Sequence, residues 1–324
     1  MKLLLFAAFL TLATIADAQT RYSIPVKIWA YGVSNAPSYD DIKNTMQNLN
    51  KLNAQTETGF SYYLLDLEFV KKKKFDDMGF HSQMPWQSVT RHDKNMLNIA
   101  LVGALSKSGD KAKNQGRTGV CFSLTGSVTV TKGEDMSVVT HEVGHFLGLK
   151  HQLDLKDNIM SYNPDKTKRR VFTDAQKKQM LDEAAKMKNS KLWKLAADEP
   201  TPDEFEPDSQ YELATPIRNG KTQQHTFHRI IDGDGSTAYD TEDYLRFSFS
   251  KKTTLDSPKI VVEATSPNAI RIELLDSNRT VLKSADGATL DLDGTAPGSY
   301  FIRIVNTQKA TSTYSVSLKL NNEE

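Results

Sequence analysis

The sequence predicts an α+β domain followed by an all-β sandwich. Three observations support this division. The chain has 324 residues, more than one compact domain usually needs. Its first half alternates strand patterns with amphipathic helical patterns, and its second half shows short alternating apolar and polar runs without long helical periodicity. A content of 38% hydrophobic and 25% charged residues is typical of a globular protein and argues against a multi-span membrane protein.

Residues 1–18 have the composition of a secretory signal peptide. A lysine precedes an apolar run from Leu3 to Ala13, and Ala16-Asp17-Ala18 forms a cleavage site of small residues. The run is too short to span a bilayer, so we expect export and cleavage after Ala18 without stable membrane insertion. The protein is then extracellular or periplasmic. Because Cys121 is the only cysteine, no internal disulfide can form, and bacterial secretion is favoured.

A change in composition marks the boundary between the two domains. Residues 196–210 contain three prolines and six acidic residues, which we expect to be too polar and too stiff to bury. The domains are therefore expected at 19–196 and 209–324, joined by an acidic, proline-rich linker at 197–208. The net charge is +9 over residues 19–195 and −8 from residue 196 onward. No basic stripe interleaved with aromatic residues accompanies the positive charge, so we expect no nucleic-acid partner.

The first half combines strands with capped helices. Ser38 followed by Asp41, and Thr173 followed by Gln176, have the spacing of helix-capping boxes. The predicted elements are strands at 22–32, 60–70, 97–105 and 119–130, and helices that begin after Ser38, near Asp135 and at Thr173.

The second half consists of alternating runs that predict the strands of a β-sandwich. Turn residues separate the runs at the spacing that such a fold requires. The predicted strands are residues 244–250, 259–264, 269–275, 299–305 and 313–320.

The segment HEVGHFLGLKH, residues 141–151, has the pattern of a catalytic metal site. His141 and His145 are four residues apart, which places both imidazoles on one face of a helix. Gly148 can end that helix in the left-handed conformation and turn the chain so that His151 reaches the same ion. Three imidazoles and one open position are typical of catalytic rather than structural zinc, so we expect one catalytic Zn²⁺. Ordinary surface histidines are the alternative, which is disfavoured because three of the seven histidines occupy the required positions.

Glu142 lies beside the expected ligands and can serve as general base and acid. It would take a proton from a zinc-activated water and pass it to the leaving amine. An apolar stripe of Val139, Val143, Phe146 and Leu147 predicts that the helix packs on a sheet while its histidines face outward.

The segment 141–151 resembles the HExxHxxGxxH signature of the metzincin metallopeptidases. Residues 158–162, NIMSY, resemble the methionine-containing turn of that clan. The resemblance implies a metzincin-like catalytic domain, a twisted mixed sheet with long helices, in which Met160 forms an apolar floor under the zinc site. Tyr162 is placed like the tyrosine of astacins, serralysins and pappalysins, which implies that it lies near the metal and stabilises the tetrahedral intermediate. A tyrosine that serves only packing is the alternative.

Residues 171–180 resemble the FTxxQ helix start of pappalysin-like enzymes, including the cytophagalysin type. Two features depart from that group. Only eight residues separate His151 from Met160, and the usual cysteine pairs are absent. The resemblance is specific only over residues 138–180.

The second half resembles the bacterial pre-peptidase C-terminal domain at residues 206–209, 214–216, 240–247 and 297–304. The resemblance implies a role in secretion, processing or attachment to a polymer or cell surface, and some such domains bind calcium. Asp232-Gly-Asp234-Gly235 is similar to a calcium loop but lacks its ligand pattern, so a polar hairpin tip is favoured. The sequence therefore contains no good binding motif for Ca²⁺.

Two further features have weaker interpretations. Lys166, Lys168, Arg169 and Arg170 follow the methionine turn, and we expect them to border the substrate cleft and favour acidic residues on the leaving-group side. Lys71–Lys74 is expected to be a solvated loop. Cys121 lies in a predicted strand, so a buried free thiol is favoured over a latency cysteine that blocks zinc.

Together these features predict a secreted zinc endopeptidase that acts on protein or peptide substrates. Two alternatives stay open: a zinc hydrolase for a non-peptide bond, and a secreted polymer- or surface-binding protein in which the zinc domain is secondary. The endopeptidase is favoured because every catalytic group is present.

Overall fold

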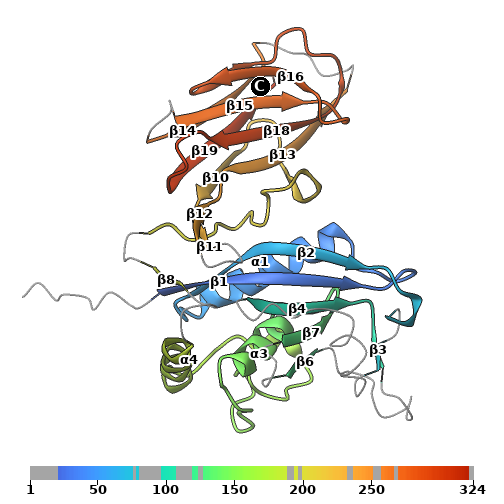
Figure 1. Cartoon of the computed structure of the whole chain (residues 1–324), viewed down its shortest axis with the longest axis vertical. Helices are drawn as coiled ribbons and strands as arrows, with labels where there is room; N and C mark the ends of the chain where they lie inside the picture. Colours follow the sequence, from blue (N-terminus) through green and yellow to red (C-terminus); the bar gives the residue numbers. More distant parts are fainter. Residues whose placement is uncertain are drawn as a thin grey trace, which may run out of the picture.

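The computed structural model places two stacked regions along the longest axis of the molecule (Figure 1). Strands of the first half lie in the lower part of the view, and most strands of the second half lie in the upper part. The expected signal peptide and the Asp232–Gly235 segment lie outside the described residues. The structure describes residues 21–75, 78–79, 96–106, 119–122, 127–187, 193–195, 199–231, 236–250, 257–265 and 269–320.

A mixed sheet forms the first half, with the strand order β2-β1-β4-β7-β6. Its first four strands are parallel, and β6 is an antiparallel edge strand. The predicted strand at 119–130 is therefore two strands, β6 and β7. The bounds are β1 Arg21–Tyr31, β2 Phe60–Val70, β4 Leu97–Val102, β6 Gly119–Phe122 and β7 Ser127–Thr131, with β8 Trp193–Leu195 antiparallel to β1 and a small pair of β3 Met78–Gly79 and β5 Leu105–Ser106.

Three α-helices are described, and both predicted capping boxes are confirmed. The helices are α1 Tyr39–Gln55, α3 Met136–Phe146 and α4 Asp174–Lys186. Ser38 caps α1 with Asp41, and Thr173 caps α4 with Gln176. Short 3₁₀ turns are η1 Lys73–Phe75, η2 Lys166–Lys168 and η3 Tyr211–Leu213. Within the described residues, no helix combines the length and apolarity needed to cross a bilayer.

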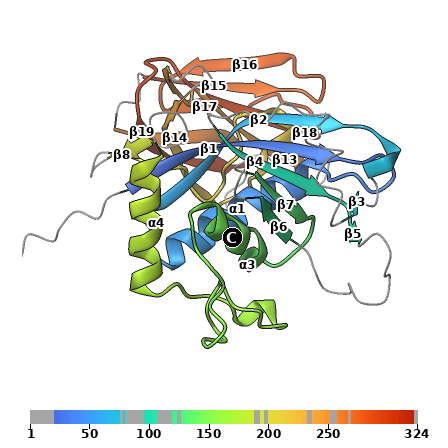
Figure 2. The same cartoon turned by 60° about the horizontal axis from the view of Figure 1, so that its bottom comes forward.

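Helices α1 and α3 pack against each other, and α3 lies against β6 and β7 (Figure 2). Their apolar side chains share one core with the sheet, including Ile42 of α1, Ile99 of β4 and Val143 of α3. The expectation that the α3 histidines face outward is wrong for His141, which is only 6% exposed. The chain after α3 covers the face of the helix that carries His141, and this face lies outside the apolar stripe.

The second half contains two larger sheets, whose strands are mostly antiparallel. The two sheets share an apolar core. This arrangement is consistent with an all-β sandwich, and all five predicted runs form strands. The four-stranded sheet has the order β10-β19-β14-β17, the five-stranded sheet has the order β16-β15-β18-β13-β9, and β11 pairs with β12. The bounds are β9 Thr215–Pro216, β10 Thr222–Phe227, β11 Arg229–Ile231, β12 Thr237–Tyr239, β13 Glu242–Phe249, β14 Lys259–Ala264, β15 Ile270–Leu275, β16 Val281–Asp286, β17 Thr289–Asp291, β18 Gly298–Asn306 and β19 Ser312–Lys319.

The expectation that the acidic segment 196–210 is too polar to bury is wrong. Glu199, Glu206 and Asp208 are 7%, 4% and 0% exposed. Buried carboxylates are tolerated where groups of opposite charge compensate them, and Arg229 lies 2.9 Å from Glu199. The segment is therefore packed structure and not a solvated linker at these positions.

Helix α1 contacts this segment and the first turn of the second half. The buried Lys43 ammonium donates hydrogen bonds to the Leu213 carbonyl and the Thr215 hydroxyl. The Gln47 side-chain amide donates to the Glu204 carbonyl at 2.9 Å. These hydrogen bonds join the two halves of the chain.

Candidate metal centre

The end of α3 and the turn after it bring three histidines together. Gly148 has φ +83°, the left-handed conformation that glycine adopts without a Cβ penalty, and its amide donates to the His145 carbonyl at 3.0 Å. The chain reverses there and returns His151 to the helix. Ring centroids are 4.8 Å apart for His141 and His145, 5.2 Å for His141 and His151, and 4.5 Å for His145 and His151. We call this group the histidine triad.

Hydrogen bonds to carbonyl oxygens orient the two helical imidazoles. His141 Nδ1 lies 2.7 Å from the Ile159 oxygen, and His145 Nδ1 lies 2.8 Å from the Leu149 oxygen. A carbonyl only accepts, so each Nδ1 carries the proton and each Nε2 keeps a lone pair. His145 Nε2 and His151 Nε2 are 3.1 Å apart, close to the separation of about 3.3 Å that two ligands have at about 2.0–2.1 Å from a tetrahedral zinc ion.

The triad is held in the neutral form that metal ligation requires. Burial lowers the pKa of His141 to about 3. Burial also lowers the pKa values of His145 and His151. Three neutral imidazoles with converging nitrogens are a donor set that fits zinc.

Glu142 is buried between α3 and the edge strand β6. The Cys121 backbone amide hydrogen-bonds the carboxylate, and a Cβ on Gly119 would lie 2.7 Å from Glu142 Oε1. A larger residue at position 119 would displace the Glu142 side chain. Burial raises the pKa of Glu142 to about 8, although Arg169 and the Cys121 amide favour the charged form. A carboxyl group with such a pKa can both accept and release a proton near neutral pH.

Met160 lies directly under α3. It is fully buried, and a Cβ on Gly144 would lie 2.6 Å from its Sδ atom. The preceding residue, Ile159, supplies the carbonyl that orients His141. The methionine turn therefore both supports the helix and orients one histidine.

A pair of side-chain amides, which no sequence pattern indicated as part of the site, fixes this turn. Asn158 Nδ2 donates to Gln176 Oε1 at 2.7 Å, and Gln176 Nε2 donates back to Asn158 Oδ1 at 3.2 Å. Asn158 Oδ1 also accepts from the Met160 amide at 2.9 Å. The pair joins the cap of α4 to the metal site, and the only sequence signal was the capping glutamine.

Tyr162 contacts the third histidine. Its hydroxyl oxygen lies 2.9 Å from His151 Nδ1, and the two ring centroids are 4.2 Å apart. With Nε2 directed toward the triad, Nδ1 carries the proton and donates to the tyrosine. Tyr162 is thus a partner of His151 here, and its 65% exposure leaves room for the side chain to swing.

The basic cluster after the methionine turn is largely compensated within the protein. Arg169 is 7% exposed and donates to the Ser161 carbonyl at 3.3 Å, near Glu142. These four basic side chains are therefore not four uncompensated charges that could select acidic substrates. The ion pairs are Lys166 with Glu134 at 2.6 Å, Lys168 with Asp165 at 3.2 Å and Arg170 with Asp135 at 2.8 Å.

Cys121 is a free, half-buried thiol. Burial and the neighbouring Glu142 raise its pKa to about 12, so it is protonated at neutral pH. The side chain packs against the apolar core of the first half.

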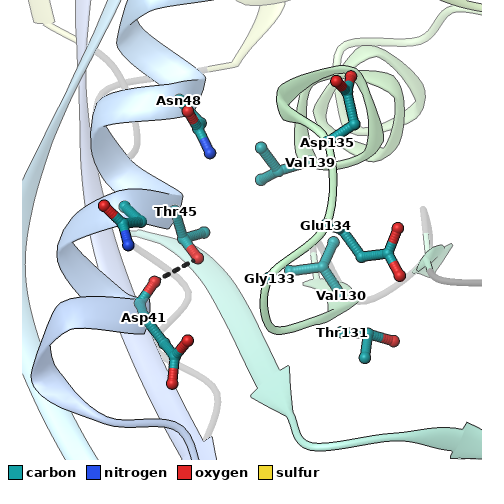
Figure 3. Close-up of a pocket in the computed structure, with 10 residues that line it drawn as sticks. Asp41, Thr45, Asn48, Val130, Thr131, Gly133, Glu134, Asp135 and Val139 are labelled. Carbon is teal, nitrogen blue, oxygen red and sulfur yellow. Dashed lines mark hydrogen bonds between the residues drawn. The ribbon is translucent and has the colours of Figure 1, made fainter. Parts of the chain in front are cut away.

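A separate cavity of about 40 Å³ lies between α1 and the turn that leads from β7 to α3 (Figure 3). Thr45 donates to the Asp41 carbonyl at its edge. Asp135 and Val139 of the α3 region line it, but no histidine of the triad does. Its size suits one or a few water molecules rather than a substrate.

Comparisons with known proteins give weak similarities. No family model and no curated protein matches the chain. Archaemetzincin from Methanopyrus kandleri is 11% identical, covers 53% of this chain and 99% of its own, and has a TM-score of 0.37. Metalloproteinase-II from Bacteroides fragilis is 16% identical, with coverages of 49% and 53% and a TM-score of 0.35. The pre-peptidase C-terminal domain of a Bacillus anthracis collagenase is 16% identical, with coverages of 33% and 94% and a TM-score of 0.25.

With TM-scores below 0.5, these similarities define neither the clan nor the activity. The chemistry of this chain follows from the geometry of its own histidine triad.

Proposed function

We propose that the chain is a secreted zinc-dependent endopeptidase of the metzincin type, nearest in its motifs to pappalysin-like enzymes. The observation that carries this proposal is the convergence of His141, His145 and His151, each imidazole oriented through Nδ1. A buried acid, Glu142, follows the first of them. Accidental histidines would not share three oriented rings, a depressed pKa and an adjacent general base.

The residues of the site have separate roles in peptide hydrolysis. Zinc, when bound, would activate a water molecule and polarise the scissile carbonyl. Glu142 accepts the proton of the attacking water and passes it to the leaving amine, and its raised pKa suits both steps. Tyr162, released from His151, would donate a hydrogen bond to the developing oxyanion.

Hydrolysis of casein by the zinc-loaded protein tests the proposal. We expect activity that a chelator abolishes and added zinc restores. Glu142→Ala should lose at least about a hundredfold in kcat while it retains zinc, because proton transfer and not metal binding is removed. Glu68→Gln, an exposed carboxylate on β2, is the matched control and should keep full activity. A folded, zinc-loaded protein that leaves casein and a peptide library intact would contradict an endopeptidase.

Secretion is a separate part of the proposal and rests on residues 1–18. Expression of the full chain in a bacterial host should yield an exported protein whose N-terminus is Gln19. Retention of Met1 in a cytoplasmic product would contradict it.

A further inference from the structure

A second group of histidines and carboxylates lies at the junction between the two halves of the chain, outside the histidine triad. Residues 203–208, 225–228 and 240–243 meet there. Tyr63 of β2 reaches the group from the first half, with its ring centroid 5.8 Å from that of His228. In Figure 1, β11 and β12 of this region lie between the two larger blocks of strands.

Glu206, His228 and Asp240, which we call the Glu206 cluster, are 4%, 2% and 5% exposed. His228 Nδ1 lies 3.3 Å from Glu206 Oε1 and 3.9 Å from Asp240 Oδ2. Both ring nitrogens and both of these oxygens are buried without a hydrogen-bond partner. One ligand atom from each of the three side chains lies within 4.8 Å of the other two.

Asp208, His225 and Asp243, the Asp208 cluster, repeat this arrangement at 0%, 1% and 0% exposure. His225 Nδ1 lies 3.3 Å from Asp208 Oδ2. Both oxygens of Asp208, the Nδ1 of His225 and one oxygen of Asp243 lack a hydrogen-bond partner. The other oxygen of Asp243 accepts from the Tyr314 hydroxyl, which fixes that carboxylate.

The hydrogen bond of the His225 ring leaves its Nδ1 facing a carboxylate. Its Nε2 donates to Gln223 Oε1 at 3.4 Å, and its ring is stacked between Phe205 at 4.7 Å and Tyr314 at 5.5 Å. A neutral ring with its proton on Nε2 presents a lone pair at Nδ1, directed at the Asp208 carboxylate. Two electron-rich atoms at 3.3 Å in a dry site repel each other unless a proton or a metal cation lies between them.

The charge balance of the two clusters leads to the same conclusion. Four carboxylates, those of Glu206, Asp208, Asp240 and Asp243, are at most 5% exposed, and the imidazoles of His225 and His228 are the basic rings that face them. Lys43 is a cation from the first half that lies close enough to act on Asp208. So many buried carboxylates are stable only if they are protonated or if further cations compensate them.

We propose that the Glu206 cluster and the Asp208 cluster bind two divalent cations of the zinc class, one ion per cluster. Each cluster offers one imidazole nitrogen and two carboxylates, a donor set that suits zinc and its neighbours. Calcium prefers six to eight oxygen ligands and rarely takes imidazole. The two ions fasten the acidic segment to the second half and stabilise the junction with α1 and β2.

The metal content of a variant without the histidine triad tests the proposal. The full chain with His141→Ala and His145→Ala is loaded with ZnCl₂ in the presence of excess CaCl₂, desalted, and analysed by mass spectrometry of its metals. We expect two zinc ions per chain in this variant and three in the unaltered protein. Cobalt in place of zinc should give absorption bands from mixed nitrogen and oxygen ligands. An absence of bound metal would overturn the site, and two calcium ions would overturn the zinc-class assignment.

Isosteric substitutions assign the ions to their clusters. Glu206→Gln and Asp208→Asn should each lower the zinc content by one ion per chain and lower the Tm of the zinc-loaded protein. Glu263→Gln, an exposed carboxylate of β14, should change neither. A full zinc content in both cluster variants would contradict the assignment. This readout does not depend on casein hydrolysis, so its failure is distinct from failure of the proposed peptidase.

Discussion

Replacement of Gly144 by alanine tests how closely the metal helix lies on the methionine turn. The new Cβ would stand 2.6 Å from Met160 Sδ, about 0.8 Å short of an ordinary contact of 3.4 Å. Met160 is fully buried, so it cannot swing into solvent to relieve the overlap. Either the helix or the turn must move.

Two opposing contributions set the size of the effect. Alanine in a helix interior is more stable than glycine by about 1 kcal/mol. Overpacking in a buried contact costs about 1–3 kcal/mol. We therefore predict a net destabilisation of about 1 kcal/mol for Gly144→Ala, and a loss of roughly tenfold in zinc affinity because the turn also orients His141 through Ile159.

A double-mutant cycle isolates the contact between the two residues. Met160→Ala alone should cost about 2–5 kcal/mol through the cavity it leaves. Combined with Gly144→Ala, the new methyl group occupies part of that cavity, so we expect the double variant to be at least about 1 kcal/mol more stable than the sum of the single effects predicts.

Tryptophan fluorescence during denaturant unfolding measures these stabilities in the first half alone. All three tryptophans, Trp29, Trp86 and Trp193, precede residue 196. Two results would refute the close contact. One is that the effects of the two single substitutions add within about 0.5 kcal/mol. The other is that Gly144→Ala raises the free energy of unfolding by about 1 kcal/mol and leaves zinc binding unchanged.

Three further predictions concern residues around the triad. Tyr162→Phe should lower kcat with little change in zinc content, since the hydroxyl contacts His151 but adds no donor to the triad; loss of zinc in equilibrium dialysis would instead make it essential for ligation. Burial opposes the charge of Asp135, but hydrogen bonds from Arg170 and Ser137 lower its pKa, so its stabilising effect is lost as the pH falls through that lowered value. The free energy of unfolding of Asp135→Asn should therefore fall less between neutral and acidic pH than that of the unaltered protein. The same dependence on pH in both proteins would contradict this prediction. Gly148→Ala should destabilise by about 1 kcal/mol in urea unfolding because φ is +83° there, whereas equal stability would contradict a strained turn.

The elements with local causes were predictable. Ser38 and Thr173 begin helices because their side chains cap amides three residues later in the chain. The alternating runs of the second half formed strands because alternation itself separates a buried face from an exposed one. The missed strands β12 and β17 have three residues each, too few to show an alternating pattern in the sequence.

The acidic segment shows why burial could not be predicted from composition. Glu206 and Asp208 flank Pro207 and look like linker residues, yet both are buried. Their partners, His225 and His228, lie about twenty residues away, and Lys43 lies in the first half. Whether a carboxylate can be buried depends on such partners, and those are set by the fold.

The sequence by itself determined the spacing of the metal site. His141 and His145 share a helix face because of the helical period, and Gly148 permits the turn that returns His151. Only the tertiary structure decided the burial of Glu142 against β6, the carbonyl partners that orient the imidazoles, and the position of Tyr162 against His151. Proton positions and pKa values depend on desolvation and on groups remote in the chain, so a local motif cannot specify them.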